Sequence, residues 1–134
     1  GMVHQHFMLV PVFTVAENIG FWSTFLSGQP PAERPDTNSV LSRFALTALA
    51  DIPARALSAG QTRRLALARL LAAHRPVWLL DEPTVSLDTA SQQLLAALID
   101  AHTASGGIVV AATHIPLGLA RTRTLSLAPT AEAA

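Results

Sequence analysis

The sequence predicts an α/β fold in which a short parallel sheet is joined to a small helical subdomain. Two apolar runs, VWLL at 77–80 and IVVAA at 108–112, have the length and composition of buried strands. A helix that starts at Asp88 or Thr89 should run between them and end before the glycines at 106–107. A strand, a helix and a second strand in this order predict a parallel crossover unit.

The first predicted helix begins at a capping box. Thr14 is followed three residues later by Glu17, so each side chain can bond the other residue's backbone N–H. The pattern FWSTFL continues this helix with aromatic residues on a packing face, and Gly28 ends it. We expect Trp22 and Phe25 in the core, because a base-stacking platform would need basic residues interleaved with them.

Two further helices are predicted before the first apolar strand. Residues 36–49 form an amphipathic pattern, and residues 61–74 are rich in good helix formers up to the break at Pro76. Arg63 and Arg69 interrupt this last helix and are interpreted as solvated. The apolar positions of the 36–49 helix are Val40, Leu41, Phe44, Leu46 and Leu49.

One short helix and one strand are predicted near the end of the chain. Residues 116–120 predict a short helix that begins at a proline, and residues 124–127 predict a last strand. The alanine-rich tail after them is expected to fray.

The stretch LSAGQ at 57–61 stands directly before the 61–74 helix. It combines a small hydroxyl with small residues, the composition expected where backbone N–H groups at a helix start face an anion. A phosphate group would suit this helix end.

Polar side chains follow both predicted strands. Asp81 and Glu82 come directly after VWLL, and Thr113 and His114 follow IVVAA. Ligands in open α/β sheets bind beyond the carboxyl ends of the strands, so the two carboxylates are candidates for a metal ligand and a base. A pair of solvated carboxylates is the alternative for any isolated Asp-Glu.

These motifs together resemble those of the ATP-binding-cassette (ABC) ATPases. LSAGQ resembles the signature motif, VWLLDEP the Walker B strand, VSLD the D-loop, and Thr113-His114 the switch histidine. Each motif is short, but their joint occurrence in this order is improbable by chance. The resemblance implies part of a P-loop NTPase fold. The run LSAGQTRRLALARLLAAHRPVWLLDEP most resembles the haem-exporter ATPase of cytochrome c maturation.

The first nineteen residues, GMVHQHFMLVPVFTVAENI, resemble the Q-loop region of sugar or nucleoside importer ATPases. By that resemblance Gln5 contacts the metal and the attacking water, whereas on its own it would be a polar residue at a strand end. His4 and His6 flank it, but with no evident third ligand they are expected at a surface or edge. The start of the chain thus resembles one subfamily and the chain from about residue 21 onward resembles another. A junction between sequences from two sources near residues 19–21 is left open.

The resemblance also implies ATP and Mg²⁺ as cofactors and gives each motif residue a role. Glu82 would be the catalytic carboxylate, His114 would contact the γ-phosphate, and Asp81 would hold Mg²⁺ through water. Asp88 would lie at the seam of a head-to-tail dimer with a second ABC ATPase subunit. The residues that would contact the nucleotide of the opposite subunit are Ser58, Ala59, Gly60 and Gln61. Ala59 replaces a glycine common in the motif and still permits a close approach.

The resemblance divides the chain into three regions of a partial ABC ATPase domain. Residues 1–13 would be the Q-loop region, 14–75 the helical subdomain with the signature, and 76–134 the core from Walker B to the switch histidine. Chromosome-maintenance and break-repair ATPases insert a long coiled coil between Q-loop and signature. The short separation here has no heptad run and favours a transporter-type cassette, whose partner is a transmembrane permease.

Composition narrows the function classes further. The formal net charge is zero and 13% of the residues are charged, so a basic field that would attract nucleic acid is absent and no nucleic-acid partner is expected. The chain has no cysteine, no uninterrupted apolar stretch long enough to span a membrane and no signal-peptide pattern at its start. We expect a cytoplasmic protein that is peripheral on the inner face of the cell membrane.

Lysine is absent, because all nine basic residues are arginines. A P-loop needs the pattern GxxxxGK[ST], whose lysine reaches the terminal phosphates, and these 134 residues contain none. We therefore expect an ATP-binding and hydrolysing transporter subunit, incomplete here and inactive in isolation. The alternatives are a non-catalytic module that donates its signature or docks on a membrane protein, and an inert fragment.

Overall fold

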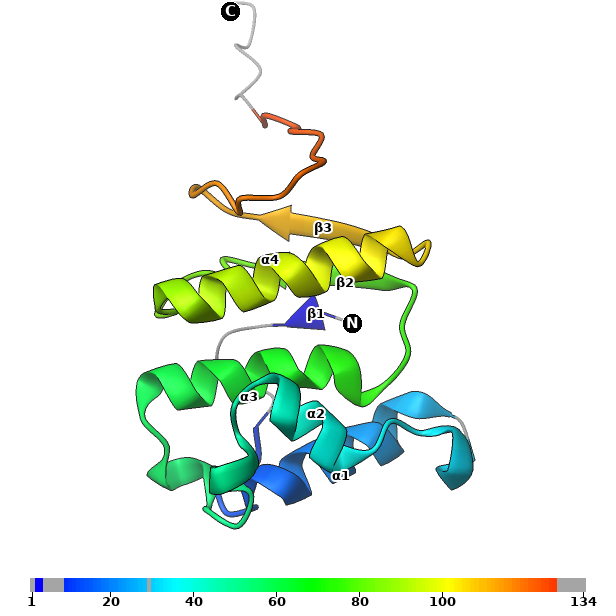
Figure 1. Cartoon of the computed structure of the whole chain (residues 1–134), viewed down its shortest axis with the longest axis vertical. Helices are drawn as coiled ribbons and strands as arrows, with labels where there is room; N and C mark the ends of the chain where they lie inside the picture. Colours follow the sequence, from blue (N-terminus) through cyan, green and yellow to red (C-terminus); the bar gives the residue numbers. More distant parts are fainter. Residues whose placement is uncertain (1, 4–8, 29, 128–134) are drawn as a thin grey trace, which may run out of the picture.

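The computed structural model describes residues 2–3, 9–28 and 30–127 (Figure 1). A layer of helices lies beside a short sheet, and one further helix, α4, lies along the sheet (Figure 1). The strands and α-helices are β1 (Met2–Val3), α1 (Val15–Ser27), α2 (Thr37–Arg43), α3 (Ala59–Ala72), β2 (Val77–Asp81), α4 (Thr89–Ala104) and β3 (Ile108–Ala112). Single-turn 3-10 helices occur at Pro31–Glu33, Thr47–Leu49 and Ala54–Ala56.

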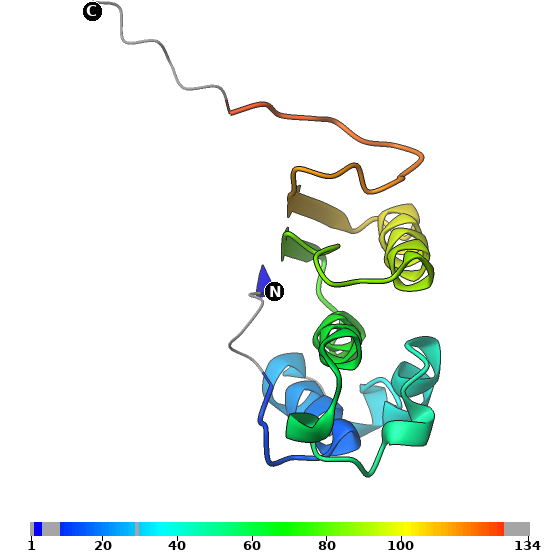
Figure 2. The same cartoon turned by 90° about the vertical axis from the view of Figure 1, so that its left-hand side faces the viewer.

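The sheet has the order β1-β2-β3, and both pairings are parallel. Leu79 in the middle of β2 pairs with Val110 of β3 on one side and with Met2 of β1 on the other. Helix α4 lies on one side of the strands (Figure 2), and Trp78 and Leu80 of β2 are buried. The predicted α/β architecture with a parallel strand–helix–strand unit is therefore confirmed.

Helix α1 begins and ends where the sequence predicts. The Thr14 hydroxyl accepts a hydrogen bond from the Glu17 N–H at 3.1 Å, and the Glu17 carboxylate accepts one from the Thr14 N–H at 2.8 Å. Gly28 closes the helix in the left-handed conformation, with φ of 57°. A residue with a side chain is disfavoured in that conformation, which explains why the helix ends at a glycine.

The Asn18 side chain links the segment before α1 to the helix through hydrogen bonds. Its side chain is fully buried, and its Oδ1 accepts a hydrogen bond from the Val10 N–H at 2.8 Å. Its Nδ2 donates to the carbonyls of Thr14, at 3.0 Å, and Val10, at 3.1 Å. A buried amide with its polar atoms satisfied costs little to bury and holds the loop in one arrangement.

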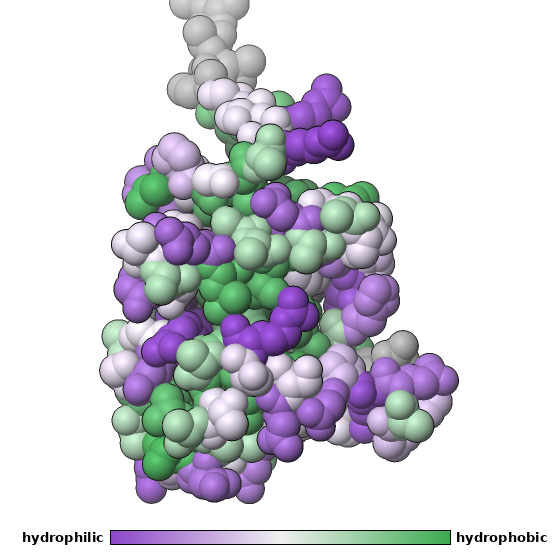
Figure 3. All heavy atoms as spheres, in the orientation of Figure 1, coloured by the Kyte–Doolittle hydropathy of each residue, from purple (hydrophilic) through white to green (hydrophobic). Residues whose placement is uncertain are grey.

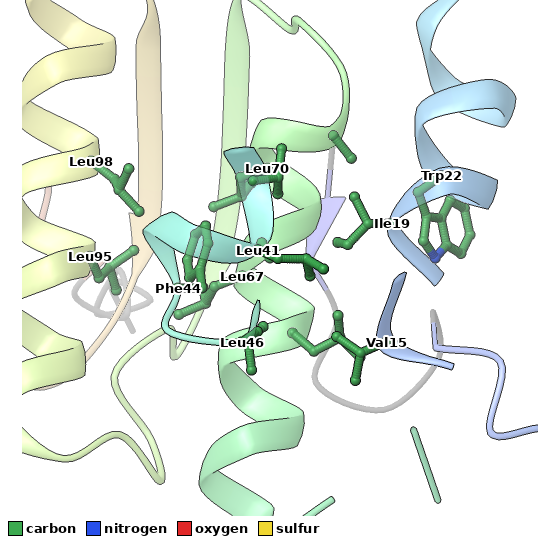
Figure 4. Close-up of a cluster of buried hydrophobic side chains, with 14 of the residues drawn as sticks. Val15, Ile19, Trp22, Leu41, Phe44, Leu46, Leu67, Leu70, Leu95 and Leu98 are labelled. Atoms are coloured by element: carbon green, nitrogen blue, oxygen red, sulfur yellow. The ribbon is translucent and has the colours of Figure 1, made fainter. Parts of the chain in front are cut away.

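One hydrophobic core joins the helical layer to the sheet. Val15 and Ile19 of α1, Leu41 and Phe44 around α2, and Leu65 of α3 are essentially inaccessible to solvent. The same core continues to Leu95 and Leu98 of α4 (Figure 4). In the view of the face that carries α4, apolar atoms gather in the band between that helix and the helical layer (Figure 3). The two layers are therefore held together by apolar packing.

The predicted helix over 36–49 is wrong in its length. Asp36 caps α2, with its carboxylate accepting from the Ser39 N–H at 2.9 Å, but the helix ends at Arg43. Ala45 then adopts a positive φ of 53°, and the chain turns so that the Leu46 N–H donates to the Leu41 carbonyl at 2.9 Å. The turn still buries Leu46, so two short helices satisfy the apolar pattern that one long helix was expected to satisfy.

The predicted helix over 116–120 and strand over 124–127 are also wrong. Neither stretch forms a helix or a strand, and Leu125 and Leu127 are exposed. A strand needs a neighbour that supplies backbone hydrogen bonds, and the segment leads away from β3 (Figure 2).

Trp22 is buried as predicted, whereas Phe25 on the next turn of α1 is exposed, which corrects its predicted place in the core. Arg69 of α3 is buried too, with its guanidinium carbon 4.2 Å from the centre of the Trp22 ring, so the interpretation of Arg69 as solvated is wrong. Burial lowers the pKa of Arg69 to about 10, and the side chain remains charged at neutral pH. The face of an indole ring attracts a cation, which accounts for this placement.

Candidate functional site

The first part of the site is the start of α3. The Ser58 hydroxyl accepts a hydrogen bond from the Gln61 N–H at 3.2 Å, and the Gln61 side chain accepts one from the Ser58 N–H at 2.9 Å. This capping box fixes the beginning of the helix at Ala59. The next N–H groups, of Ala59 and Gly60, belong to the first turn and have no acceptor within the helix. The four residues predicted to meet a phosphate therefore lie together at a helix N-terminus, where a negative charge is stabilised.

Glu82 lies directly beyond the end of β2. Its N–H donates to the Ala112 carbonyl of β3 at 2.8 Å, and its φ of 43° is left-handed. The Glu82 carbonyl accepts a hydrogen bond from the Val85 N–H at 3.2 Å, so the chain turns sharply at this residue. The turn places the carboxylate at the edge of the sheet rather than in line with the strand.

His114 meets this carboxylate from the neighbouring strand end. Its Nδ1 lies 2.8 Å from Glu82 Oε1, with the Glu82 side chain 31% and the His114 side chain 71% exposed. An ionised carboxylate only accepts hydrogen bonds, so a neutral His114 carries its proton on Nδ1 and has Nε2 as an acceptor. The sequence predicted these two residues separately, and the structure brings them into one hydrogen-bonded pair.

Arg63 corrects a prediction, because it is buried rather than solvated. It is 8% exposed, and its Nη2 donates a hydrogen bond to the Glu82 carbonyl. Burial lowers the pKa of Arg63, and the charge of Asp81 opposes that effect. A signal for this burial exists in the sequence, since Arg63 lies one and two turns before Leu67 and Leu70, on the same side of α3.

The other predicted carboxylates are also placed at the ends of elements. Asp81 is the last residue of β2 and is exposed. Asp88 caps α4, and its Oδ1 accepts from the Ser91 N–H at 2.8 Å. Hydrogen bonding to Ser91 lowers the pKa of Asp88, and Arg64 contributes to the shift through its charge. Asp88 is therefore engaged in fixing the start of α4.

Gln5, His4 and His6 lie outside the described residues. Within the parts that are described, no three side chains of His, Asp or Glu converge as a metal-binding group. None of the helices described is both long and apolar enough to cross a bilayer.

Comparison with protein families decides how this arrangement is classified. The profile of the family described as "ABC transporter" matches residues 1–85 of the 134. The chain belongs to the ABC transporter family. The matched range includes Ser58–Gln61 and β2 with Glu82.

Curated relatives of this ABC chain are named "Cytochrome c biogenesis ATP-binding export protein CcmA". The relative from Nitrobacter hamburgensis is 54% identical over 112 residues, which is 84% of this chain and 55% of the relative. That from Rhodopseudomonas palustris is 53% identical over the same number of residues, 84% of this chain and 54% of the relative. The resemblance to the cytochrome c maturation ATPases is thus confirmed, and the chain spans about half the length of the curated relatives it matches.

Solved ABC structures share the fold. A dimeric structure of a bacterial ABC transporter cassette superposes with a TM-score of 0.66 at 31% identity, covering 86% of this chain and 52% of that one. A putative metal-chelate type ABC transporter in an inward-facing conformation gives a TM-score of 0.62 at 29% identity, covering 85% of this chain and 48% of that one. The predicted ABC ATPase type of fold is confirmed by these neighbours.

Proposed function

We propose that this chain supplies the signature and the water-activating pair of an ATP-binding and hydrolysing ABC transporter subunit of the haem-exporter type. The observation that carries this is the hydrogen bond between Glu82 and His114 at the carboxyl edge of the sheet. The names of the relatives, which include ATP binding and export, support the transporter class. In this proposal residues 1–13 are the Q-loop region, 14–75 the helical subdomain and 76–134 the core after Walker B.

Hydrolysis needs a water in line with the γ-phosphate and a group that orients it. The Glu82 side chain is 31% exposed and its Oε1 is bonded to His114, and in this proposal the carboxylate accepts a hydrogen bond from that water. Because Nδ1 of His114 is bonded to Glu82, Nε2 is the ring nitrogen left to contact a phosphate in this proposal. Donating from Nε2 while Nδ1 stays bonded to the carboxylate requires the imidazolium form, whose positive charge would stabilise the charge on the phosphate.

The exposed Asp81 carboxylate, one residue before Glu82, is suited to hold Mg²⁺ through water, and Gln5 is assigned to the same ion by the family resemblance. When bound, Mg²⁺ neutralises charge on the phosphate oxygens. A single carboxylate fits this ion, since Mg²⁺ at nucleotide sites keeps several water ligands.

The partners of this subunit would be a second ABC ATPase and a transmembrane permease. In a head-to-tail dimer the start of α3, from Ser58 to Gln61, would face the nucleotide bound by the opposite subunit. Asp88 would lie near the dimer seam. A permease would hold the subunit on the inner face of the cell membrane, in the cytoplasm.

A second candidate function is a non-catalytic module that completes a partner's ATP site. The observation that favours it is the hydrogen-bonded start of α3 at Ser58. The fully formed capping box at Ser58 would still present its N–H groups to a phosphate held by the partner. An inert fragment remains the third alternative.

The test is association with a complete, hydrolysis-deficient cassette of the same transporter type, followed by sedimentation with and without Mg-ATP. We expect ATP-dependent heterodimers with the parent chain and none with Ser58→Arg, whose bulk blocks the approach. Ser58→Asp should also abolish the ATP-dependent association. Aspartate preserves the helix cap, so the loss would come from repulsion between its charge and the phosphate. Equal association by the parent and both variants, or none by any of them, would contradict a role of the signature in trans.

A further inference from the structure

Glu82 is held by hydrogen bonds at both its backbone and its side chain. Its N–H donates to the Ala112 carbonyl of β3, its carboxylate is bonded to His114, and its carbonyl accepts from the Arg63 side chain of α3. Arg63 therefore connects α3 directly to the residue proposed to orient the water.

Glu82 needs such support because of its conformation. A positive φ of 43° is disfavoured for a residue with a side chain, and it persists only where the surroundings specify it. Without Arg63, the Glu82 carbonyl would keep the hydrogen bond from the Val85 N–H, at 3.2 Å, but lose the one from the guanidinium, and the chain around Glu82 would relax toward an extended conformation. That relaxation would carry the carboxylate away from His114.

The neighbouring arginines of α3 show that Arg63 has a distinct role. Arg69 is buried to a similar degree, but its guanidinium lies over the Trp22 ring. Arg64 is half-buried, and its Nη1 donates to the Phe44 carbonyl at 3.4 Å. Burial of a cation is costly, so a buried arginine aimed at one carbonyl and near Asp81 indicates a specific function for that hydrogen bond.

We propose that Arg63 is a positioning residue, which fixes the left-handed backbone of Glu82 so that the carboxylate stays against His114. This rests on the proposed function for the roles of Glu82 and His114. Ser58 caps the same helix only five residues earlier. Through its hydrogen bond to the Glu82 carbonyl, Arg63 therefore connects the start of α3 to the residue that carries the carboxylate.

The experiment reads the hydrogen bond between Glu82 and His114 directly, without nucleotide. In the ¹⁵N-histidine-labelled chain at alkaline pH, about two units above the ordinary histidine pKa of about 6.5, long-range ¹H–¹⁵N correlations report which ring nitrogen of His114 carries the proton. The parent should show the proton on Nδ1. Glu82→Ala, which removes the acceptor, should show the pattern of a free imidazole and so calibrates the measurement.

Arg63→Met should lose the parent pattern and approach that of Glu82→Ala, whereas Arg63→Lys, which keeps a cationic donor, should restore part of it. Arg69→Met is the matched control, since it replaces another buried arginine of α3 and should leave the His114 pattern unchanged. A purely structural role for Arg63 would alter thermal stability without moving the proton on His114. A folded Arg63→Met chain with the parent pattern would overturn the proposal.

A second measurement needs no variant. The guanidinium protons of Arg63, donated to a buried carbonyl, should exchange with water more slowly than those of the exposed Arg55. Equal exchange rates would overturn the proposal even if Arg63→Met does not fold. Neither result depends on ATP binding, so failure of this proposal is distinguishable from failure of the proposed function.

Discussion

His114 and Glu82 are 32 residues apart in the sequence, yet the imidazole Nδ1 lies 2.8 Å from the carboxylate Oε1. The two meet because β2 and β3 are parallel neighbours in register, with Asp81 paired to Ala112. Each strand delivers a polar residue just past its carboxyl end, where open α/β sheets bind their ligands. The pair is thus a direct result of the strand–helix–strand unit.

The pair should not hydrolyse ATP in this chain alone. The 134 residues provide no lysine and no glycine-rich P-loop, so the phosphates lack their cradle and Mg-ATP should bind weakly. The measurement is single-turnover hydrolysis with the purified chain in excess over ATP, with Glu82→Gln as the control for contaminating ATPases. Turnover by the parent that disappears in Glu82→Gln would show this prediction to be wrong.

The cap at Asp88 should make the stability of α4 dependent on pH. Its pKa is lowered by the hydrogen bond to Ser91, so the ionised carboxylate stabilises the folded chain above the unfolded pKa of about 3.9. This contribution should be lost as the pH falls through the lower folded-state pKa. Asp88→Asn keeps a capping oxygen but does not ionise.

The measurement is the difference in melting temperature between the parent and Asp88→Asn across acid and neutral pH. The parent should be the more stable at neutral pH, and the difference should shrink below about pH 4. A difference that stays constant with pH would mean that the charge of Asp88 contributes nothing.

Local sequence signals predicted the starts of the principal helices and the two longer strands. Thr14, Ser58 and Asp88 each cap a helix, because the capping oxygen lies within three residues of the N–H that it accepts. The prediction for 36–49 was wrong because the turn at Ala45 preserves the same buried positions as a continuous helix. Periodicity alone cannot separate these two arrangements.

The sequence predicted which residues form the candidate site, but not which of them are hydrogen-bonded to one another. Asp81 and Glu82 were identified from their positions after an apolar strand, and His114 from its resemblance to the switch histidine. The structure supplied the hydrogen bond between Glu82 and His114. Arg63 was interpreted as solvated because a charged residue on a helix is usually exposed. Its acceptor is a backbone carbonyl nineteen residues away, which no local pattern specifies.

Gly107 should be intolerant of any side chain. A Cβ at this position would overlap the ring of His102, which stacks on Trp78 with 3.9 Å between ring centroids. Gly107→Ala should displace that stack and destabilise the chain by about 1–3 kcal/mol, the usual cost of overpacking.

Gly20→Ala is the matched variant for this test. A Cβ there meets nothing within 4 Å, and the residue lies inside α1, so the change should stabilise the chain by about 0.5–1 kcal/mol. Chemical denaturation of both variants measures the free energies of unfolding. Equal effects of the two changes would contradict the contact between Gly107 and His102.

The sheet face opposite α4 should make the chain self-associate. On this face Leu79 of β2 is 37% exposed, and Ile108 and Val110 of β3 are 58% and 57% exposed. These side chains alternate with the buried ones along parallel strands, so they lie side by side as a continuous apolar surface. Burying that surface against a second copy is favourable, and we expect an association that increases with concentration in sedimentation equilibrium.

Polar replacements on the sheet face identify the surface responsible. The double variant Ile108→Thr and Val110→Thr retains β-branched residues but removes apolar area worth about 1 kcal/mol per residue, so association should weaken roughly fivefold for each change. The control is Leu125→Thr with Leu127→Thr, which removes two leucines that are more exposed but lie beyond the sheet. If hydrophobic exposure in general drove association, the leucine double variant would have the larger effect. A parent chain that sediments as a monomer at every concentration would disprove self-association through this face.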